Sequence, residues 1–241
     1  MKILIIGDSC IDKFIYGECK RICPEAPVPV FNPLNSTKND GMAKNVFNNL
    51  TSLAPDWKID FITNSNSIIK TRIVDIKTNQ MLLRIDDNDS CPKFTGLDEL
   101  KEYDAVIISD YDKGFLSEED IKYIVNKYPL TFIDSKKIFG EWVNNASFIK
   151  INQPEYEKNK ENLLNYKGQL IVTLGEKGVQ WNNMIHPPSR QAEVSDLSGA
   201  GDTFFAAFVY HYLSNQNISK ALNFAQDCSL QVIEKKGVSI I

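Results

Sequence analysis

The sequence predicts an α/β fold, a three-layer α/β/α sandwich with a mostly parallel sheet, to which a small β-sheet lid is added. The first observation is that short apolar runs alternate along the chain with segments of helical periodicity. Strands that alternate with helices form parallel sheets whose two faces are covered by those helices. The second observation is that two stretches break this alternation, and we assign both to the lid.

Five short apolar runs are the expected strands of the parallel sheet. Each has the length of a strand and is too short for a helix. Ligands of such sheets bind beyond the carboxyl ends of the strands, so residues that follow these runs are the first candidates for a site. The runs are Lys2–Gly7, Ala105–Ser109, Leu130–Asp134, Phe148–Asn152 and Leu170–Leu174.

Two segments carry the signals of surface helices. Ser117–Lys127 begins with a capping serine and an acidic first turn, and Ile121 and Ile124 lie on one face. Ser219–Lys235 has the same periodicity, and Gly237 is a suitable stop.

The expected lid segments are residues 14–31 and 68–86. Phe14–Phe31 contains three prolines, too many for a helix or a central strand. Ile68–Asp86 alternates apolar and polar residues, which suits an antiparallel strand with one solvated face. The length of 241 residues suits one domain, residues 1–241, that includes the lid, or at most two small domains.

Composition excludes several classes of protein. The net charge of −4 does not favour nucleic acid or an anionic membrane surface, and no apolar run reaches the ~20 residues that a membrane helix needs. We therefore expect no nucleic-acid partner, no membrane partner and a cytoplasmic location. The five cysteines cannot all pair internally, so we expect free thiols. His186 and His211 stand alone, which argues against a histidine-based metal site or triad.

The strongest local signal is the segment Gly199-Ala200-Gly201-Asp202, which precedes an apolar, helix-like run. Its glycines let the backbone approach a ligand, and the following helix aims free N–H groups at that ligand. Phosphoryl transfer needs such a cradle, and Asp202 can accept a proton from an attacking hydroxyl. The alternative is a glycine turn in which Asp202 only caps the helix. Phe204 stands where a dinucleotide-binding fingerprint has its third glycine, and the sequence has no Walker-type loop.

Asn152 and Glu155 form a second candidate, at the end of a predicted strand. Their side-chain oxygens can hold magnesium, directly or through water. A helix start with Pro154 in its first turn explains the same residues equally well.

The third candidate is residues 173–178, Thr-Leu-Gly-Glu-Lys-Gly, which also follow a predicted strand. Their glycines would let a nucleotide lie against the backbone, although a hairpin turn explains the segment better when it is taken alone. All three candidates fall at the carboxyl ends of strands, and this shared position favours a common site.

These three segments, in the order in which they occur along the chain, resemble those of the ribokinase-like carbohydrate kinases. Gly41-Met42-Ala43-Lys44-Asn45 is similar to the glycine-rich sugar-binding segment of that family, and Asp12 to its sugar-contacting aspartate. The resemblance implies a ribokinase-like fold and a sugar kinase that uses ATP and Mg²⁺.

A narrower resemblance, to the heptose 7-phosphate kinases, rests on longer stretches. These are residues 7–30, with their proline-rich centre, and residues 79–86, 109–114 and 133–136. This resemblance implies transfer of the γ-phosphate of ATP to the anomeric hydroxyl of a heptose 7-phosphate, a precursor of lipopolysaccharide.

The resemblance also implies a role for each candidate residue. Asp202 is the catalytic base, and Asn152 and Glu155 organise magnesium. The backbone amides expected to stabilise the transferring phosphoryl group are those of Gly199, Ala200 and Gly201. The expected nucleotide-binding residues are Thr173, Gly175, Gly178, Gln226 and Gly237. The expected sugar-binding residues are Asp12, Gly41, Asn45, Arg84 and Lys113.

The chain departs from the family pattern at several positions. Met42 replaces the second glycine of the usual pair, Asp40 replaces a proline, and Gln226 replaces an asparagine beside the adenine. Between Asn45 and Lys70 we expect the chain to lack a helix and a strand that relatives have. Two alternatives to the heptose kinase stay open: a kinase for a different sugar or sugar phosphate, and a catalytically silent homologue that binds sugar or nucleotide.

The expected partners are a small-molecule sugar or sugar phosphate and a second copy of the chain. A sheet of two or three strands is marginal alone and exposes unpaired edges. We therefore expect a homodimer joined through the β lid. The alternative is a lid that folds only over its own active site.

Overall fold

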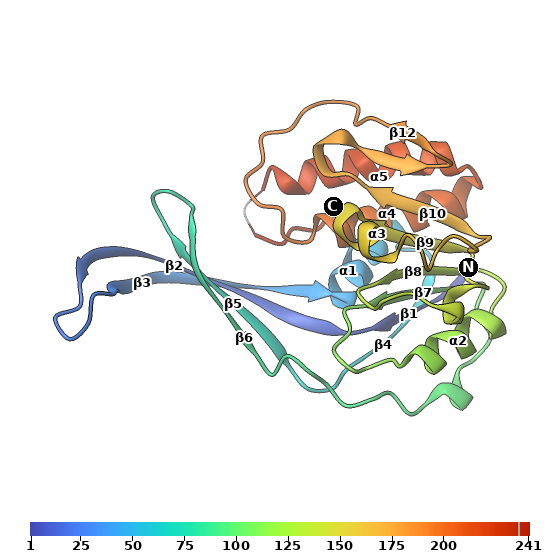
Figure 1. Cartoon of the computed structure of the whole chain (residues 1–241), viewed down its shortest axis with the longest axis horizontal. Helices are drawn as coiled ribbons and strands as arrows, with labels where there is room; N and C mark the ends of the chain where they lie inside the picture. Colours follow the sequence, from blue (N-terminus) through green and yellow to red (C-terminus); the bar gives the residue numbers. More distant parts are fainter. Residues whose placement is uncertain (236) are drawn as a thin grey trace.

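The computed structural model describes residues 1–235 and 237–241 and contains two sheets (Figure 1). The larger sheet has eight strands in the order β12-β11-β10-β9-β8-β7-β1-β4. The strands from β10 to β4 in this order are parallel, and β11 and β12 continue the sheet as antiparallel strands. Their bounds are β1 Lys2–Gly7, β4 Lys58–Thr63, β7 Ala105–Asp110, β8 Thr131–Ser135, β9 Phe148–Asn152, β10 Gln169–Thr173, β11 Val179–Trp181 and β12 Met184–His186.

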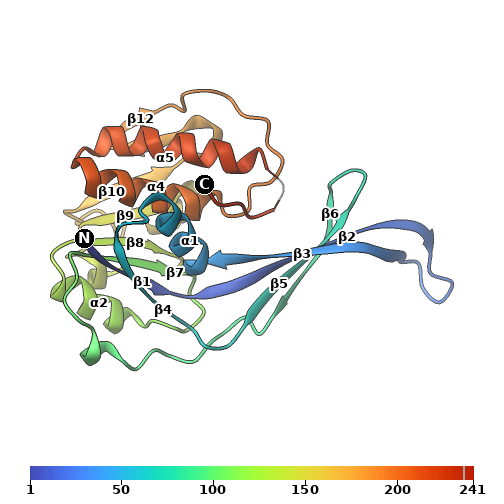
Figure 2. The same cartoon turned by 180° about the vertical axis from the view of Figure 1, so that it is seen from behind.

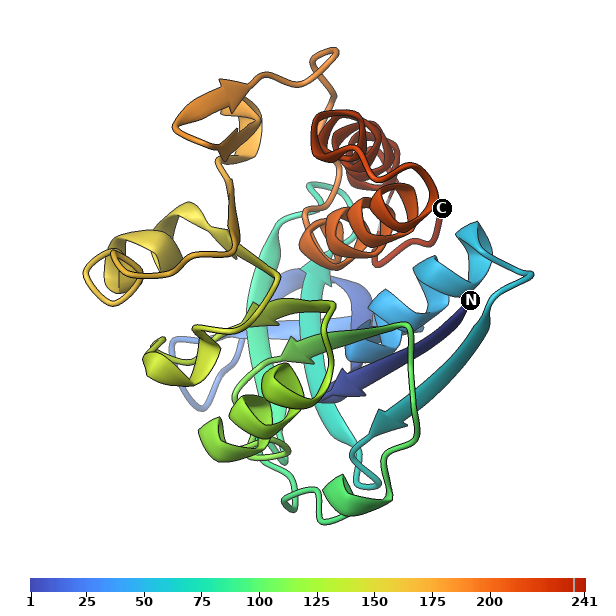
Figure 3. The same ribbon diagram turned by 90° about the vertical axis from the view of Figure 1, so that its right-hand side faces the viewer.

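Helices cover both faces of the larger sheet, which Figure 3 shows from its side. Side chains alternate along the strands, so Ile3 and Ile5 of β1 enter the core under α1, α4 and α5, whereas Leu4 and Ile6 enter the core under α2. The predicted three-layer α/β/α sandwich is therefore confirmed. The helices are α1 Ala43–Leu53, α2 Glu118–Lys127, α3 Gln153–Asn159, α4 Ala200–Asn215 and α5 Ile218–Ile233, with 3₁₀ helices at Leu97–Glu99, Glu141–Val143 and Gly175–Lys177.

Aromatic contacts fix α4 against the centre of the sheet. Phe132 of β8 stacks on Phe148 of β9 with ring centroids 4.8 Å apart. Phe208 of α4 meets both rings edge-on, at centroid distances of 6.3 and 5.5 Å. Because such buried rings contribute several kcal/mol, they hold α4 in place over the sheet.

The smaller sheet is the lid, and it projects from the body of the molecule (Figures 1 and 2). Its order is β3-β2-β5-β6, with β2 paired antiparallel to β3, parallel to β5, and β5 antiparallel to β6. Strands from both expected lid segments form this sheet, so the predicted small β-sheet is confirmed. Its strands are β2 Ser9–Ile22, β3 Pro29–Met42, β5 Ile68–Asp75 and β6 Met81–Asp87.

The lid strands are longer than the sequence indicated. Pro24 and Pro27 lie in the connection between β2 and β3, and Pro29 is the first residue of β3, an edge strand. A proline is tolerated at each of these positions because no ladder bond needs its missing N–H. The prolines therefore mark a turn between two long strands.

Two predicted helices are confirmed, with small differences at their ends. The Ser117 hydroxyl accepts a bond from Asp120 N, and the Asp120 carboxylate accepts one from Ser117 N, which forms a capping box at the start of α2. The last helix begins after a cap at Asn217 and ends at Ile233, before the expected Lys235.

The segment between Asn45 and Lys70 holds most of α1 and all of β4, neither of which we identified from the sequence. Buried asparagines, Asn45 and Asn49, interrupt the apolar face of α1. Strand β4 lies at the sheet edge and includes the polar residue Asp60. None of the helices formed by the described residues is long and apolar enough to cross a membrane.

Candidate active site

Polar side chains gather at the carboxyl ends of the parallel strands, beneath the first turn of α4 and beside the root of the lid. Asp8 follows β1, Tyr111 follows β7, Asp134 lies in β8, and Lys150 and Asn152 lie in β9. Ligands of α/β sheets bind at this edge. The three sequence segments singled out above therefore do share one location.

The first turn of α4 presents free backbone N–H groups. Gly199 precedes the helix in the left-handed conformation, with φ of 81°, and no side chain caps this end. Thr203 N donates to Gly199 O at 2.9 Å, and Ala200 N donates to Leu197 O at 3.3 Å. Within the part of the chain that the structure describes, the Gly201 amide has no backbone acceptor. This amide and the positive end of the helix dipole can therefore face an anion.

Asp202 lies in this first turn and is buried. Tyr111 Oη donates to its Oδ1 at 2.5 Å, and Asn45 Nδ2 donates to its Oδ2 at 3.2 Å. Burial raises the pKa of Asp202 to about 6, and Asp134 adds to the rise, whereas the bonds from Tyr111 and Asn45 and the charge of Lys150 oppose it. A carboxylate with this pKa is ionised at neutral pH and still basic enough to take a proton.

A buried ion pair lies next to Asp202. Lys150 Nζ donates to Asp134 Oδ2 at 2.6 Å, and both side chains are buried. Burial acts to raise the pKa of Asp134, but Lys150 and Lys136 outweigh it and hold this pKa below its ordinary value. A Cβ at Gly201 would lie only 3.2 Å from Lys150 Nζ, so glycine leaves the ammonium room beside the first turn of α4.

Asn152 and Glu155 form the capping box of α3. Asn152 Oδ1 accepts from Glu155 N, and Glu155 Oε2 accepts from Asn152 N, both at 2.9 Å. Pro154 lies in the first turn, as a helix start requires. Lys136 Nζ donates to Glu155 Oε1 at 2.5 Å and lies 3.7 Å from Asp134 Oδ1. The helix-start interpretation of this motif is therefore confirmed, and both its side chains are fixed at the sheet edge.

The same residues are compatible with Mg²⁺. Asn152 and Glu155 offer hard oxygen donors, and Asp134 Oδ1 is buried without a hydrogen-bond partner, so a further positive group finds a free acceptor here. Within residues 1–235 and 237–241, no group of three or more His, Cys, Asp or Glu side chains is arranged to hold a metal ion. Because Mg²⁺ usually keeps several of its waters and binds through one or two carboxylates, Asn152 and Glu155 would hold it partly through water.

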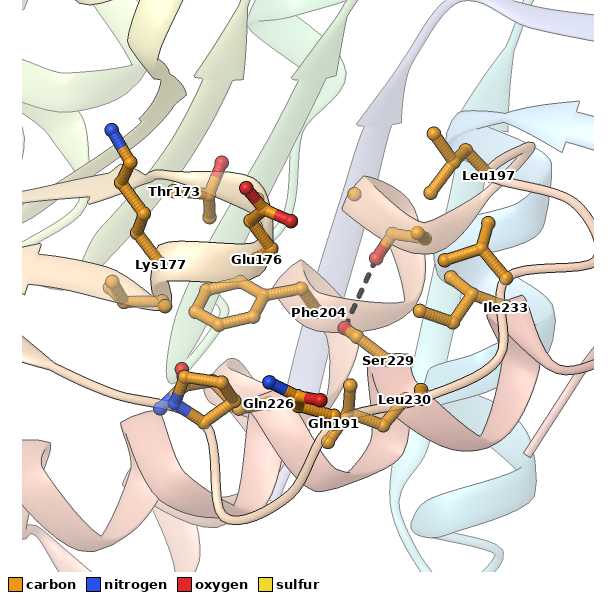
Figure 4. A pocket seen from close by; sticks show the side chains of 18 of the residues that line it. Thr173, Glu176, Lys177, Gln191, Leu197, Phe204, Gln226, Ser229, Leu230 and Ile233 are labelled. Carbon is orange, nitrogen blue, oxygen red and sulfur yellow. Dashed lines mark hydrogen bonds between the residues drawn. The ribbon is translucent and has the colours of Figure 1, made fainter.

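A cavity of about 730 Å³ opens beside the first turn of α4 (Figure 4). It lies between the hairpin of β10 and β11, the loop before α4, and α5. The hairpin interpretation of residues 173–178 is confirmed, since β10 and β11 pair antiparallel and Leu174 N donates to Gly178 O at 2.8 Å. The predicted residues that line the cavity are Thr173, Gly175, Gly178, Ala200, Gly201 and Gln226.

Gln226 is the polar group of interest in this cavity. Its side chain is buried, and among the described residues neither amide atom has a hydrogen-bond partner. Buried polar atoms are rarely left without partners, so we expect a bound ligand to supply the hydrogen-bond partners of this amide. Gly237 lies outside the cavity: its N donates to Asp196 Oδ2, and a Cβ there would be 3.6 Å from Asn39 Oδ1.

Three of the expected sugar-binding residues converge at the root of the lid. Asp12 is buried and forms an ion pair with Arg72. A Cβ at Gly41 would overlap Asp12 Oδ2, which shows how closely these two residues approach. Asn45 bonds to Asp202, so this group lies on the lid side of the candidate base.

The other two, Arg84 and Lys113, belong to a group of charges on the same side of the lid. Lys113 Nζ donates to Asp89 Oδ2 at 2.6 Å, and Lys70 Nζ donates to Asp89 Oδ1 at 3.2 Å. Arg84 donates to both carboxylate oxygens of Asp86. Arg72 and Arg84 are opposite each other in the register of β5 and β6. Four cations thus lie on the lid side of the site: Lys70, Arg72, Arg84 and Lys113.

Sequence reasoning missed Lys70, Arg72, Tyr111, Lys136 and Lys150. Lys150 stands inside an apolar run, FIKIN, and only the sheet order brings it beside Asp134 and Gly201. Lys70 and Arg72 are two residues apart in β5, so their side chains lie on the same face of the lid. This spacing could have indicated from the sequence that both side chains face the site.

Comparisons with known proteins identify a protein family. The sequence pattern of the pfkB family carbohydrate kinases matches residues 117–241. Two curated relatives are the bifunctional proteins HldE of Helicobacter acinonychis, 30% identical over 296 residues, and of Helicobacter hepaticus, 32% identical over 299 residues. Each alignment covers 99% of this chain but 64% and 61% of the relative, so the chain spans less than two thirds of their length. Both alignments are longer than the chain, so these relatives carry residues without a counterpart here.

Solved structures share the fold. A ribokinase from Thermotoga maritima superposes with a TM-score of 0.76 at 16% identity, covering 98% of this chain and 94% of the ribokinase. A nucleoside kinase from Burkholderia thailandensis, in complex with inosine, gives a TM-score of 0.72 at 16% identity and covers 98% and 92%. The ribokinase-like architecture expected from the sequence is thus confirmed.

Gly199 provides a test of the local geometry. A Gly199→Ala substitution places a Cβ at a φ of 81°, 2.7 Å from Asn45 Nδ2. Gly175→Ala is a matched control, because its φ is 62° and a Cβ meets nothing within 4 Å. The backbone strain alone costs about 1–2 kcal/mol, and we expect Gly199→Ala to lose at least ~1 kcal/mol more from steric overlap. Urea unfolding measures both values, and equal losses would contradict the contact with Asn45.

Proposed function

This chain belongs to the pfkB family of carbohydrate kinases, and we propose that it transfers the γ-phosphoryl group of ATP to the anomeric hydroxyl of a heptose 7-phosphate. One observation carries the proposal. Asp202, a buried carboxylate, lies at a helix start between the cavity by Gln226 and the acceptor residues Asp12 and Asn45. A base is needed at this point between donor and acceptor, because the attacking hydroxyl must lose its proton there.

The roles of the site residues follow from their positions. The adenine and ribose occupy the cavity against residues 173–178 and Gln226, and its volume of about 730 Å³ is in the range of small-molecule sites. The triphosphate extends towards the amide of Gly201 and the ammonium of Lys150, which stabilise charge on the transferring group. The acceptor oxygen bonds to the γ-phosphorus, its proton passes to Asp202, and the bond to the bridging oxygen of ADP breaks.

The group of cations supports an acceptor that itself carries a phosphate. Lys70 and Lys113 both pair with Asp89, which is exposed and lies after the end of β6. A phosphate dianion is a stronger partner for two ammonium groups than one carboxylate, so it can replace Asp89 between them. Together with the motif resemblance to heptose 7-phosphate kinases, this favours a sugar phosphate over a neutral sugar.

One observation favours the alternative of a different sugar. Met42 is a non-glycine residue with φ of 59°, and its buried side chain packs with Cys10 and Ile68 at the root of the lid. A glycine in its place would leave that volume to a ligand. The acceptor pocket of this chain therefore differs in shape from that of relatives with a glycine pair. A silent homologue is less well supported, since binding alone requires no base such as Asp202.

Asp202→Asn tests the proposed base directly. The amide keeps the shape of the side chain but cannot take the proton, so we expect kcat to fall by ~10²–10⁴-fold with ATP affinity nearly unchanged. Because the pKa of Asp202 is raised to about 6, wild-type kcat/KM should fall as pH decreases through about 6, where the base becomes protonated. Wild-type turnover by the variant would exclude Asp202 from the mechanism.

Magnesium dependence is the second prediction. We propose that Asn152 and Glu155 position Mg²⁺, which neutralises phosphate charge when it is bound. Glu155→Gln should raise the Mg²⁺ concentration for half-maximal rate by roughly tenfold. Glu157→Gln, at an exposed position on α3, is the control. Full activity of the wild type in excess EDTA would contradict the proposal.

The acceptor phosphate is tested with Lys113→Ala. Loss of a charge-assisted contact to phosphate should raise KM for heptose 7-phosphate by about tenfold or more and leave KM for the unphosphorylated heptose nearly unchanged. Lys160→Ala, which removes an exposed lysine directly after α3, serves as control. Equal effects on both acceptors would mean that Lys113 does not contact the phosphate.

We also propose that the lid joins two copies of the chain. Ile15, Ile73 and Leu83 are neighbours across β2, β5 and β6, and strand alternation places them on the face opposite Arg72 and Arg84. Leu83 is 53% exposed, and β3 and β6 are open edges. A second lid would cover this apolar row through a two-fold contact.

Light scattering at micromolar concentration tests the dimer. We expect twice the chain mass of 27.3 kDa, and a Leu83→Asp variant should shift the mass to that of a monomer and weaken sugar binding. Leu164→Asp, at an exposed position on the body, should leave the mass unchanged. An active wild-type monomer would show that the lid covers only its own site.

A further inference from the structure

Tyr111 is fixed at both ends between the sheet and α4. Its backbone N donates to Asp8 Oδ2 at 2.6 Å, and its hydroxyl donates to Asp202 Oδ1 at 2.5 Å. Lys136 Nζ lies 5.1 Å from the centre of its ring. The ring also packs against the apolar group at the lid root that includes Met42. The hydroxyl therefore has one defined position, and that position is on the carboxylate of Asp202.

The contact of Tyr111 is with the carboxylate that serves as the proposed base. Each oxygen of Asp202 receives one hydrogen bond, Oδ1 from Tyr111 and Oδ2 from Asn45. A carboxylate oxygen has a second acceptor position, so both bonds can persist while an acceptor hydroxyl approaches. The mechanism above gives Tyr111 no role, and a backbone anchor on Asp8 would suffice if the residue only filled space.

We propose that Tyr111 is the positioning residue of the catalytic base: its hydroxyl holds the Asp202 carboxylate in a fixed orientation between the nucleotide cavity and the acceptor residues. The inference rests on the proposed role of Asp202. It adds to the base a second residue, Tyr111, which follows strand β7. The packing of the Tyr111 ring also connects the base to the root of the lid.

The proposal has a consequence for proton affinity, because a donor to the ionised carboxylate favours the ionised form. The charged and titratable groups that face Asp202 are Tyr111, Asp134, Lys150, Lys136 and Cys10. Burial and Asp134 raise the pKa of Asp202 to about 6, while Tyr111, Asn45 and Lys150 act against the rise. Removal of the Tyr111 hydroxyl alone must therefore move this pKa further upward.

The experiment compares Tyr111→Phe with Tyr103→Phe. Tyr103 makes a similar bond, from its hydroxyl to Asp60 Oδ2 at 2.9 Å, but it precedes β7 at the opposite edge of the sheet. We expect the acid limb of kcat/KM for Tyr111→Phe to move to higher pH by roughly one unit, together with a lower plateau at high pH, where the carboxylate is ionised but no longer held in one orientation. Tyr103→Phe should keep the wild-type profile. An acid limb that stays at its wild-type pH in Tyr111→Phe, with or without a loss of rate, would overturn the proposal.

A second readout does not depend on turnover. NMR titration of ¹³C-labelled aspartate carboxyls in the free protein should show a higher pKa for Asp202 in Tyr111→Phe than in wild type. Site-specific 3-fluorotyrosine at position 111, a stronger donor that preserves the fold, should move it in the opposite direction. If the wild type consumes no ATP with any sugar, the proposed function fails, but this titration still decides whether Tyr111 acts on Asp202. An Asp202 pKa that responds to neither substitution would overturn the inference.

Discussion

The buried carboxylate of Asp202 sets the conditions that the surrounding structure must meet. A charge removed from water is tolerated only with hydrogen bonds and compensating charges, and here these come from separate parts of the chain: Asn45 at the start of α1, Tyr111 after β7 and Lys150 in β9. Those residues meet only if the parallel strands end at one level and α4 begins directly above them. The fold and the chemistry of the site therefore depend on the same arrangement.

Carboxylates and lysines alternate in a network beside Asp202. Asp134 lies between Lys150 and Lys136, and Lys136 in turn contacts Glu155. Such a buried network contributes little to stability by itself, but removal of one partner leaves an uncompensated charge. Its position beside the first turn of α4 suggests a different reason for its presence. In the proposed reaction, it brings two ammonium groups to the place where phosphate oxygens would accumulate charge during transfer.

The sequence was informative where structure is local. Short apolar runs identified the central strands, and the glycine segment, the Asn152–Glu155 motif and residues 173–178 all proved to lie at one edge of the sheet. Features that depend on contacts between distant parts of the chain could not be predicted from the sequence. In the sequence, Lys150 only interrupts an apolar strand, and its role depends on the sheet order that places it beside Asp134. Tyr111 is important only because the first turn of α4, far along the chain, places Asp202 beside its hydroxyl. Strand β4 and the hairpin of β11 and β12 are too short or too polar to stand out by pattern.

The central claim is that the donor cavity and the acceptor residues meet at Asp202, so that a phosphoryl group passes directly from ATP to a sugar. Phosphorus NMR of a mixture of the protein, Mg·ATP and heptose 7-phosphate follows donor and product in one measurement. The account predicts that the γ-phosphate signal of ATP declines while one new sugar 1-phosphate signal grows in equal amount and the 7-phosphate signal persists. Release of inorganic phosphate without a new sugar phosphate, with heptose 7-phosphate or with any other sugar offered, would contradict it.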